Sequence, residues 1–150
     1  MDAVTYPDTK VSDFIQKNLI ALRIPSDAKP HAADFQITWT PTLIVLDHDG
    51  REHHRSVGFL SPEELIPALL LGMAKTRFEQ QQYAESLAVI QNLLDGYPAS
   101  GAAPEALFLK GVAGYKNTHD PKPLKEAYEQ LTAQYPSSEW TKRAYPYRLL

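Results

Sequence analysis

The segment at residues 39–50 constrains the fold of this chain more than any other part of the sequence. Pro41 stands before a short apolar run, and Asp49-Gly50 closes the segment. Because proline has a fixed φ and no backbone N–H, it costs no ladder hydrogen bond at the first residue of a strand. Glycine adopts the positive φ that a tight hairpin turn requires. The segment therefore predicts a strand over Thr42–Asp47 that returns antiparallel over Glu52–Gly58.

The residues before this hairpin predict two helices and one further strand. Asp8 is a suitable N-cap for a helix that ends near Asn18, and a second short helix is expected over residues 30–35. Leu19–Ile24 is mostly apolar without alternation, which is typical of a strand that is covered on both faces. We therefore expect a buried strand between the two helices.

A longer helix is expected after the hairpin. Ser61-Pro62-Glu63-Glu64 supplies an N-cap serine, a proline at the first helical position and a glutamate at the third, which together satisfy several free backbone N–H groups. Pro67 lies inside this helix and deletes one backbone hydrogen bond, so a kink or a late restart is expected. The apolar stripe of the helix consists of Leu65, Ile66, Leu69, Leu70 and Met73.

The sequence after Met73 gives no strand signal and contains a loose internal repeat. Two runs of apolar and aromatic residues at helical spacing end in the same dipeptide, Tyr97-Pro98 and Tyr135-Pro136. Two helical hairpins are therefore expected, with Trp140 closing the stack. The residues that can begin their helices are Pro104, Asp120, and Ser137 or Ser138.

The order of these elements resembles the later two-thirds of a thioredoxin-like domain, over about residues 1–72. The resemblance is carried by Trp39-Thr40-Pro41-Thr42 at the start of one strand and by Val57–Glu64 between the last strand and the last helix. In thioredoxin-like proteins the residue before this proline pairs through its backbone with an extended peptide. The resemblance therefore implies Thr40 and Pro41 as peptide-binding residues, with Trp39 beside them. The alternative, given equal weight, is that Thr40-Pro41 only shapes the start of a strand, and packing is the favoured role of Trp39.

The absence of cysteine from the chain excludes disulfide bonds, thiolate nucleophiles and cysteine-ligated metals. In the family that the chain resembles, two cysteines separated by two residues begin a helix after a central strand, and this sequence has neither. That strand would lie between Leu19–Ile24 and Leu43–Leu46, so its absence leaves two unpaired edges that favour pairing between copies of the chain. The alternative is a rearranged sheet of three strands. Met1 is accordingly expected to lie just downstream of the cysteine motif of a longer protein.

The second half of the chain resembles tetratricopeptide repeats, in which small residues permit close contact between helices. The matching small, aromatic and closing-proline positions are Ala74, Tyr83 and Pro98, followed by Gly111, Ala113, Tyr128 and Pro136. The predicted fold class is α/β (α+β), with an incomplete thioredoxin-like domain at residues 1–72. An all-α, tetratricopeptide-like region of helical hairpins is expected at residues 73–150.

The histidines of the hairpin do not predict a metal site. His53 and His54 stand near Asp47, His48 and Asp49, but adjacent residues of a strand point to opposite faces and cannot both reach one ion. A solvated hairpin is predicted instead. The sequence shows no constellation of serine, histidine and aspartate and no glycine-rich phosphate loop, so no catalytic residue and no cofactor is predicted.

The charge pattern argues against a nucleic acid or a membrane as the partner. The net charge is −3, and lysine and arginine residues are scattered singly along the chain. No signal peptide or membrane span is recognised, so a cytoplasmic location is expected. The predicted function is a non-catalytic module that binds a protein or peptide and that also forms a homodimer through its unpaired sheet edges. The alternative is an N-terminally truncated part of a bacterial thiol–disulfide oxidoreductase whose cysteine motif lies upstream of Met1.

Overall fold

The computed structural model describes all 150 residues, and its sheet consists of the predicted hairpin alone. Strand β1 (Thr42–Leu46) pairs antiparallel with β2 (Glu52–Val57). Thr42 lies opposite Val57 at the open end of the hairpin, where the chain enters and leaves it. The predicted pair of strands is therefore confirmed.

The turn of the hairpin also has the predicted conformation. Gly50 has a φ of 79°, in the region that glycine adopts without strain. The carboxylate of Asp47 accepts hydrogen bonds from the backbone N–H groups of Asp49 and Arg51, at 2.9 Å each. An aspartate that accepts from backbone two residues further on is a common way to close a turn. The Asp47 side chain is thus fixed by the turn itself.

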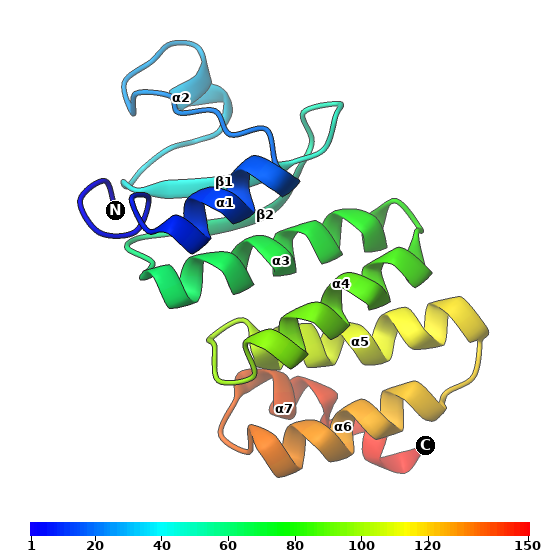
Figure 1. The fold of residues 1–150 in the computed structure, drawn as a ribbon. Helices are drawn as coiled ribbons and strands as arrows, with labels where there is room; N and C mark the ends of the chain where they lie inside the picture. Colours follow the sequence, from blue (N-terminus) through cyan, green and yellow to red (C-terminus); the bar gives the residue numbers. More distant parts are fainter.

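Seven α-helices and one 3₁₀ helix surround and follow this hairpin. Helix α3 lies against both strands and α1 on one side and against α4 and α5 on the other, so that the elements form successive layers (Figure 1). None of the helices combines the length and the hydropathy that a membrane crossing requires. The helices are α1 (Thr9–Asn18), α2 (His31–Asp34), α3 (Pro62–Glu79), α4 (Tyr83–Gly96), α5 (Ala103–Thr118), α6 (Lys122–Gln134), α7 (Glu139–Ala144) and η1 (Tyr145–Leu149).

The signals that predict helix starts are borne out at most positions. Asp8 caps α1 by accepting hydrogen bonds from the backbone N–H groups of Lys10 and Val11. Ser138 caps α7 in the same way. Helix α6 begins one residue later than its signal suggests, because Pro121 holds the cap position while the Asp120 carboxylate accepts from the next backbone N–H.

Helix α3 begins where the sequence predicts, but its N-terminal capping differs from the prediction and it has no late restart. Ser61 is the N-cap residue, yet its side chain makes no capping hydrogen bond. The carboxylate of Glu64 instead accepts from the backbone N–H of Gly101 at 2.9 Å, so it is engaged by the α4–α5 connection. The helix also continues through Pro67 without a restart. The buried proline ring contributes packing that offsets the one backbone hydrogen bond it removes.

The strand predicted at Leu19–Ile24 is wrong. Residues 20–24 form no strand and no backbone hydrogen bond, and Ile20 and Leu22 are fully or largely exposed. A strand needs a neighbour for its N–H and C=O groups, and β1 is paired only with β2. Since this segment forms no strand and does not pair with β1, the alternative of a sheet closed directly with three strands is wrong as well. The side chains of Ile20 and Leu22 therefore remain in solvent.

One buried cluster connects the hairpin with the helices, and α3 is its centre. The closest approach is at Gly72, where a Cβ atom would lie 2.6 Å from Cγ2 of Val45 on β1. Glycine at this position allows the helix to lie directly on the strand. The buried residues of the cluster are Val11, Val45, Leu65, Ile66, Leu69, Leu70, Leu71, Ala74, Ile90, Leu93, Ala103 and Ala106.

A smaller cluster holds the last helices together. Leu107, Leu131 and Ala144 form its buried part, and the ring of Trp140 lies 5.2 Å from that of Phe108. Aromatic pairs at this separation add to the energy of their burial. The C-terminal helices are therefore packed on α5 rather than loosely attached to it.

Candidate functional site

The segment predicted to bind peptides lies at the open end of the hairpin. The Thr40-Pro41 peptide bond is cis. The carbonyl oxygen of Pro41 accepts a hydrogen bond from Gly58 N at 2.8 Å, and the Thr42 hydroxyl donates to the Trp39 carbonyl oxygen at 2.6 Å. These two bonds fix the segment beside the residues that follow β2.

Three large apolar side chains are exposed in these two adjacent stretches. Trp39 is 67% exposed, Val57 57% and Phe59 60%. Single exposed apolar residues are common, whereas a group of them is typical of an interaction site. Together with Thr40 and Pro41 they are called the open-end surface here. The packing role favoured for Trp39 is wrong, because its ring lies mostly in solvent.

The backbone of Thr40 is free to pair with another chain. Neither its N–H nor its C=O group takes part in a hydrogen bond within the protein, and the residue is exposed. An extended peptide can satisfy such groups by adding itself alongside the segment. Val57 and Phe59 were not predicted as part of the site. The signal that could have identified them is the pair of apolar residues around Gly58, directly after a strand that returns to Pro41.

His53 overturns the prediction of a solvated hairpin. Its side chain is only 6% exposed and lies between two carboxylates. Its Nε2 is 3.0 Å from Oδ2 of Asp47, and its Nδ1 is 2.5 Å from Oε2 of Glu79. His54 points to the opposite face of β2, as the alternation of a strand predicts, and contacts Lys75 and Ser56. No group of three or more metal-ligating side chains is arranged to hold an ion.

The two neighbouring histidines have opposite electrostatic environments. The hydrogen bond with Asp47, followed by that with Glu79, raises the pKa of His53. The same bond from His53 is the main cause that lowers the pKa of Asp47 to about 2. Burial and the adjacent Lys75 ammonium lower the pKa of His54. The surroundings therefore favour the protonated ring of His53 on one face of the hairpin and the neutral ring of His54 on the other.

His54 lies in an open cleft of about 220 Å³ between β2, α3 and the start of α5. The Lys75 ammonium has only donors and lies 3.3 Å from Nδ1 of His54, so Nδ1 is an acceptor and the ring proton is on Nε2. Nε2 is 3.4 Å from the hydroxyl of Ser56. The histidine therefore presents an N–H to this serine, whereas activation of a serine nucleophile requires the free lone pair of a base.

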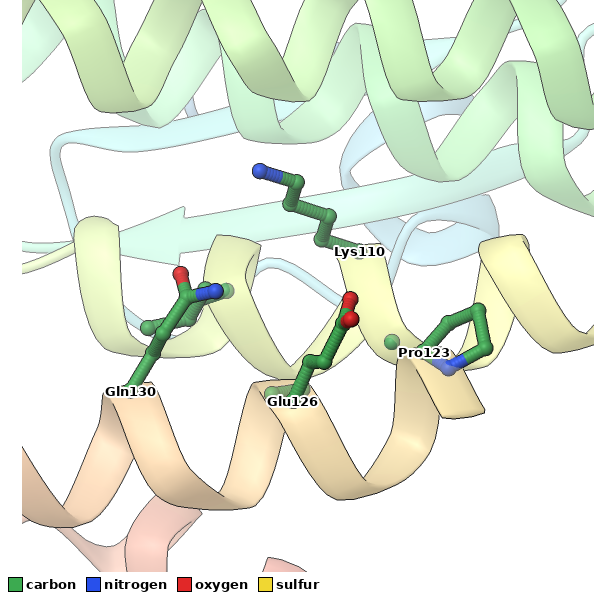
Figure 2. A pocket seen from close by; sticks show the side chains of 7 residues that line it. Lys110, Pro123, Glu126 and Gln130 are labelled. Carbon is green, nitrogen blue, oxygen red and sulfur yellow. The ribbon is translucent and has the colours of Figure 1, made fainter. Parts of the chain in front are cut away.

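A second, smaller hollow, of about 70 Å³, lies between α5 and α6. Figure 2 shows Glu126 and Gln130 reaching from α6 toward α5, while Lys110 extends away from α6. The Lys110 ammonium donates to the side chain of Gln91 on α4 at 2.9 Å. The floor of the hollow is the close contact of Gly111 with α6, so its origin is helix packing.

Comparison with known proteins supports the N-terminal half of this description. The family described as a thioredoxin-like domain matches residues 2–71. Neither the search of curated proteins nor that of solved structures found a match. The matched range contains α1, the hairpin and the first half of α3, in agreement with the resemblance stated for residues 1–72. Residues 2–71 of this chain are therefore a thioredoxin-like domain, incomplete in its sheet and free of cysteine.

Proposed function

We propose that this chain is a non-catalytic interaction module that binds an extended segment of a protein or peptide at the open-end surface. The observation that carries the proposal is the free backbone of Thr40 beside the exposed side chains of Trp39 and Phe59. Backbone pairing gives an extended peptide its affinity, and apolar side chains beside it give specificity. No residue of the chain can form a disulfide with a substrate, so binding is its proposed contribution.

The helical part is proposed to offer a second docking face. Close helix contacts at small residues, such as Gly111 against Ala127, support a tetratricopeptide-like region at residues 73–150. Under this proposal residues 1–72 bind one segment of a partner and the helices bind another, and both parts function in the cytoplasm.

Removal of the two exposed aromatic rings is expected to weaken peptide binding. Screening of the purified chain against a library of extended peptides would supply a probe, whose affinity is then measured by calorimetry. Trp39→Ala combined with Phe59→Ala is expected to reduce the affinity about tenfold or more, as for aromatic anchors in other interfaces. The fold should be unaffected because both rings are exposed.

The matched control is Tyr145→Ala, which removes an exposed aromatic ring from the C-terminal end of the chain. It should leave the affinity for the same peptide unchanged. Equal binding by the double variant and the unaltered chain would contradict the assignment of the open-end surface.

A second candidate function is that of one part of a thiol–disulfide oxidoreductase. It is favoured by the free edge of β1 and by the exposed apolar residues 20–24, which a further strand could pair with and cover. The test is the intact mass of the protein from its source cells, before and after thiol alkylation. A heavier species that takes up two alkyl groups supports this candidate, whereas a mass near 16.8 kDa without uptake supports the binding module.

We also propose that two copies of the chain associate through the free edge of β1 and the exposed apolar segment at residues 20–24. Exposed strand edges and apolar segments promote such contacts, and a charge placed there prevents them. Ile20→Lys combined with Leu22→Lys is therefore expected to abolish a concentration-dependent dimer in sedimentation velocity. At concentrations at which both proteins are monomers, thermal stability should not differ, since both side chains are exposed in the monomer. A monomer at all concentrations for the unaltered chain would refute the proposal.

A further inference from the structure

His53 connects three elements of the fold through two carboxylates. It lies on β2, while Asp47 directly follows β1 and Glu79 is the last residue of α3. Each ring nitrogen faces a carboxylate oxygen, at 3.0 Å for Asp47 and 2.5 Å for Glu79. A neutral imidazole has one N–H and one lone pair, so only the imidazolium can donate to both oxygens. The observed geometry therefore requires the charged ring.

The other charged groups nearby do not replace this charge. On β2 itself, Glu52 forms an ion pair with Arg55 at 2.6 Å, and His54 points to the opposite face. From α3, Lys75 reaches His54 and forms an ion pair with Glu105. Thus the ring of His53 is the cation that directly faces the carboxylates of Asp47 and Glu79.

We propose that protonation of His53 is a switch that fastens the turn end of the hairpin to the C-terminal end of α3. When the ring loses a proton, one nitrogen turns a lone pair toward a carboxylate, and one of the two contacts must break. The side chain of Asp47 is 4% exposed and accepts hydrogen bonds from two backbone N–H groups, whereas the side chain of Glu79 is 53% exposed. Deprotonation therefore releases Glu79 into solvent and loosens the C-terminal end of α3 from the turn end of the hairpin, while the contact with Asp47 and the packing of Gly72 on Val45 persist.

The direction of the pH dependence follows from the two carboxylates. They raise the pKa of His53, so its contribution to stability is complete below the ordinary value of about 6.5 and is lost as the pH rises through the pKa of the folded state. His54 acts in the opposite direction, because burial lowers its pKa and a proton on it disfavours the fold below about pH 6.5. Above that value His54 is neutral, so the loss of the His53 contact is observed separately.

The experiment follows the ring nitrogens of His53 by ¹⁵N NMR from pH 6 to pH 10, together with amide exchange of the hairpin. At the lower end of this range both nitrogens are expected to carry protons. As the pH rises, one nitrogen should lose its proton, and the protection factors of the β2 amides should fall at the same midpoint. A neutral tautomer throughout, or protection that does not follow the titration, would overturn the proposal.

Glu79→Gln supplies the matched variant, since it keeps the size of the side chain and removes its charge. The midpoint for His53 should move to lower pH, and the loss of β2 protection at that midpoint should become smaller, because the amide of the new side chain can donate to the neutral ring. Glu129→Gln makes the same change at an exposed position on α6 and should leave both midpoints unchanged. Midpoints that agree in both variants and in the unaltered chain would show that Glu79 does not belong to the switch.

Discussion

Replacement of Leu65 by alanine is expected to lower the free energy of unfolding by about 2–5 kcal/mol. Leu65 is fully buried near the start of α3, in the cluster that contains residues of α1, β1, α4 and α5. Its truncation removes apolar contacts and leaves a cavity that the surrounding helices can fill only in part. Because both halves of the chain contribute to this cluster, they are expected to lose stability together.

Denaturant unfolding followed by circular dichroism measures this change. The control is Leu149→Ala, where a largely exposed leucine is shortened by the same atoms and a change of about 0.5 kcal/mol or less is expected. If both variants unfolded at the same denaturant concentration, Leu65 would not occupy the shared core.

Alanine at Gly111 is expected to lower the free energy of unfolding by about 1–3 kcal/mol, the range for an overpacked core. The new Cβ would lie 2.6 Å from Cβ of Ala127 and 3.0 Å from the carbonyl oxygen of Pro123. Both neighbouring atoms belong to or adjoin the backbone of α6, so α6 itself has to move away from α5. The better helix propensity of alanine, about 1 kcal/mol, does not compensate for this displacement.

Gly96→Ala separates the cost of overpacking from the gain in helix propensity, because no atom lies within 4 Å of the position of its new Cβ. At this last residue of α4 the substitution should leave stability unchanged or raise it by up to about 1 kcal/mol. Thermal unfolding of the two variants side by side is the measurement. A stabilising effect at both positions would mean that α5 and α6 are further apart than described.

The elements that could be predicted from the sequence are those with local signals. The Asp49-Gly50 turn determines its own conformation, and Asp8 and Ser138 find their backbone partners within a few residues. The role of the segment around Pro41 in peptide binding stays a prediction, and the exposure of Trp39 is contrary to the packing role that the sequence favoured. The family match covers residues 2–71, which contain the turn and the Asp8 cap but not Ser138.

The predictions that failed depend on partners far away in the sequence. Leu19–Ile24 has the composition of a strand, but a strand exists only when a neighbour accepts its hydrogen bonds. Glu64 was assigned to a local cap, whereas its partner is the distant Gly101. His53 looks like a solvated residue until α3 brings Glu79 to it from 26 positions away. Each of these outcomes is decided by tertiary contacts that no local pattern records.

The continuity of α3 has a mechanical consequence. Its 18 residues extend for roughly 27 Å, at about 1.5 Å per residue, and pass from the thioredoxin-like domain into the helical part without a joint. Under the proposed function, this helix would set a fixed distance between the open-end surface and the docking face on the helices that follow. A partner with two suitably spaced epitopes would meet both faces at a preset distance and angle, so its second contact would form at a high effective concentration.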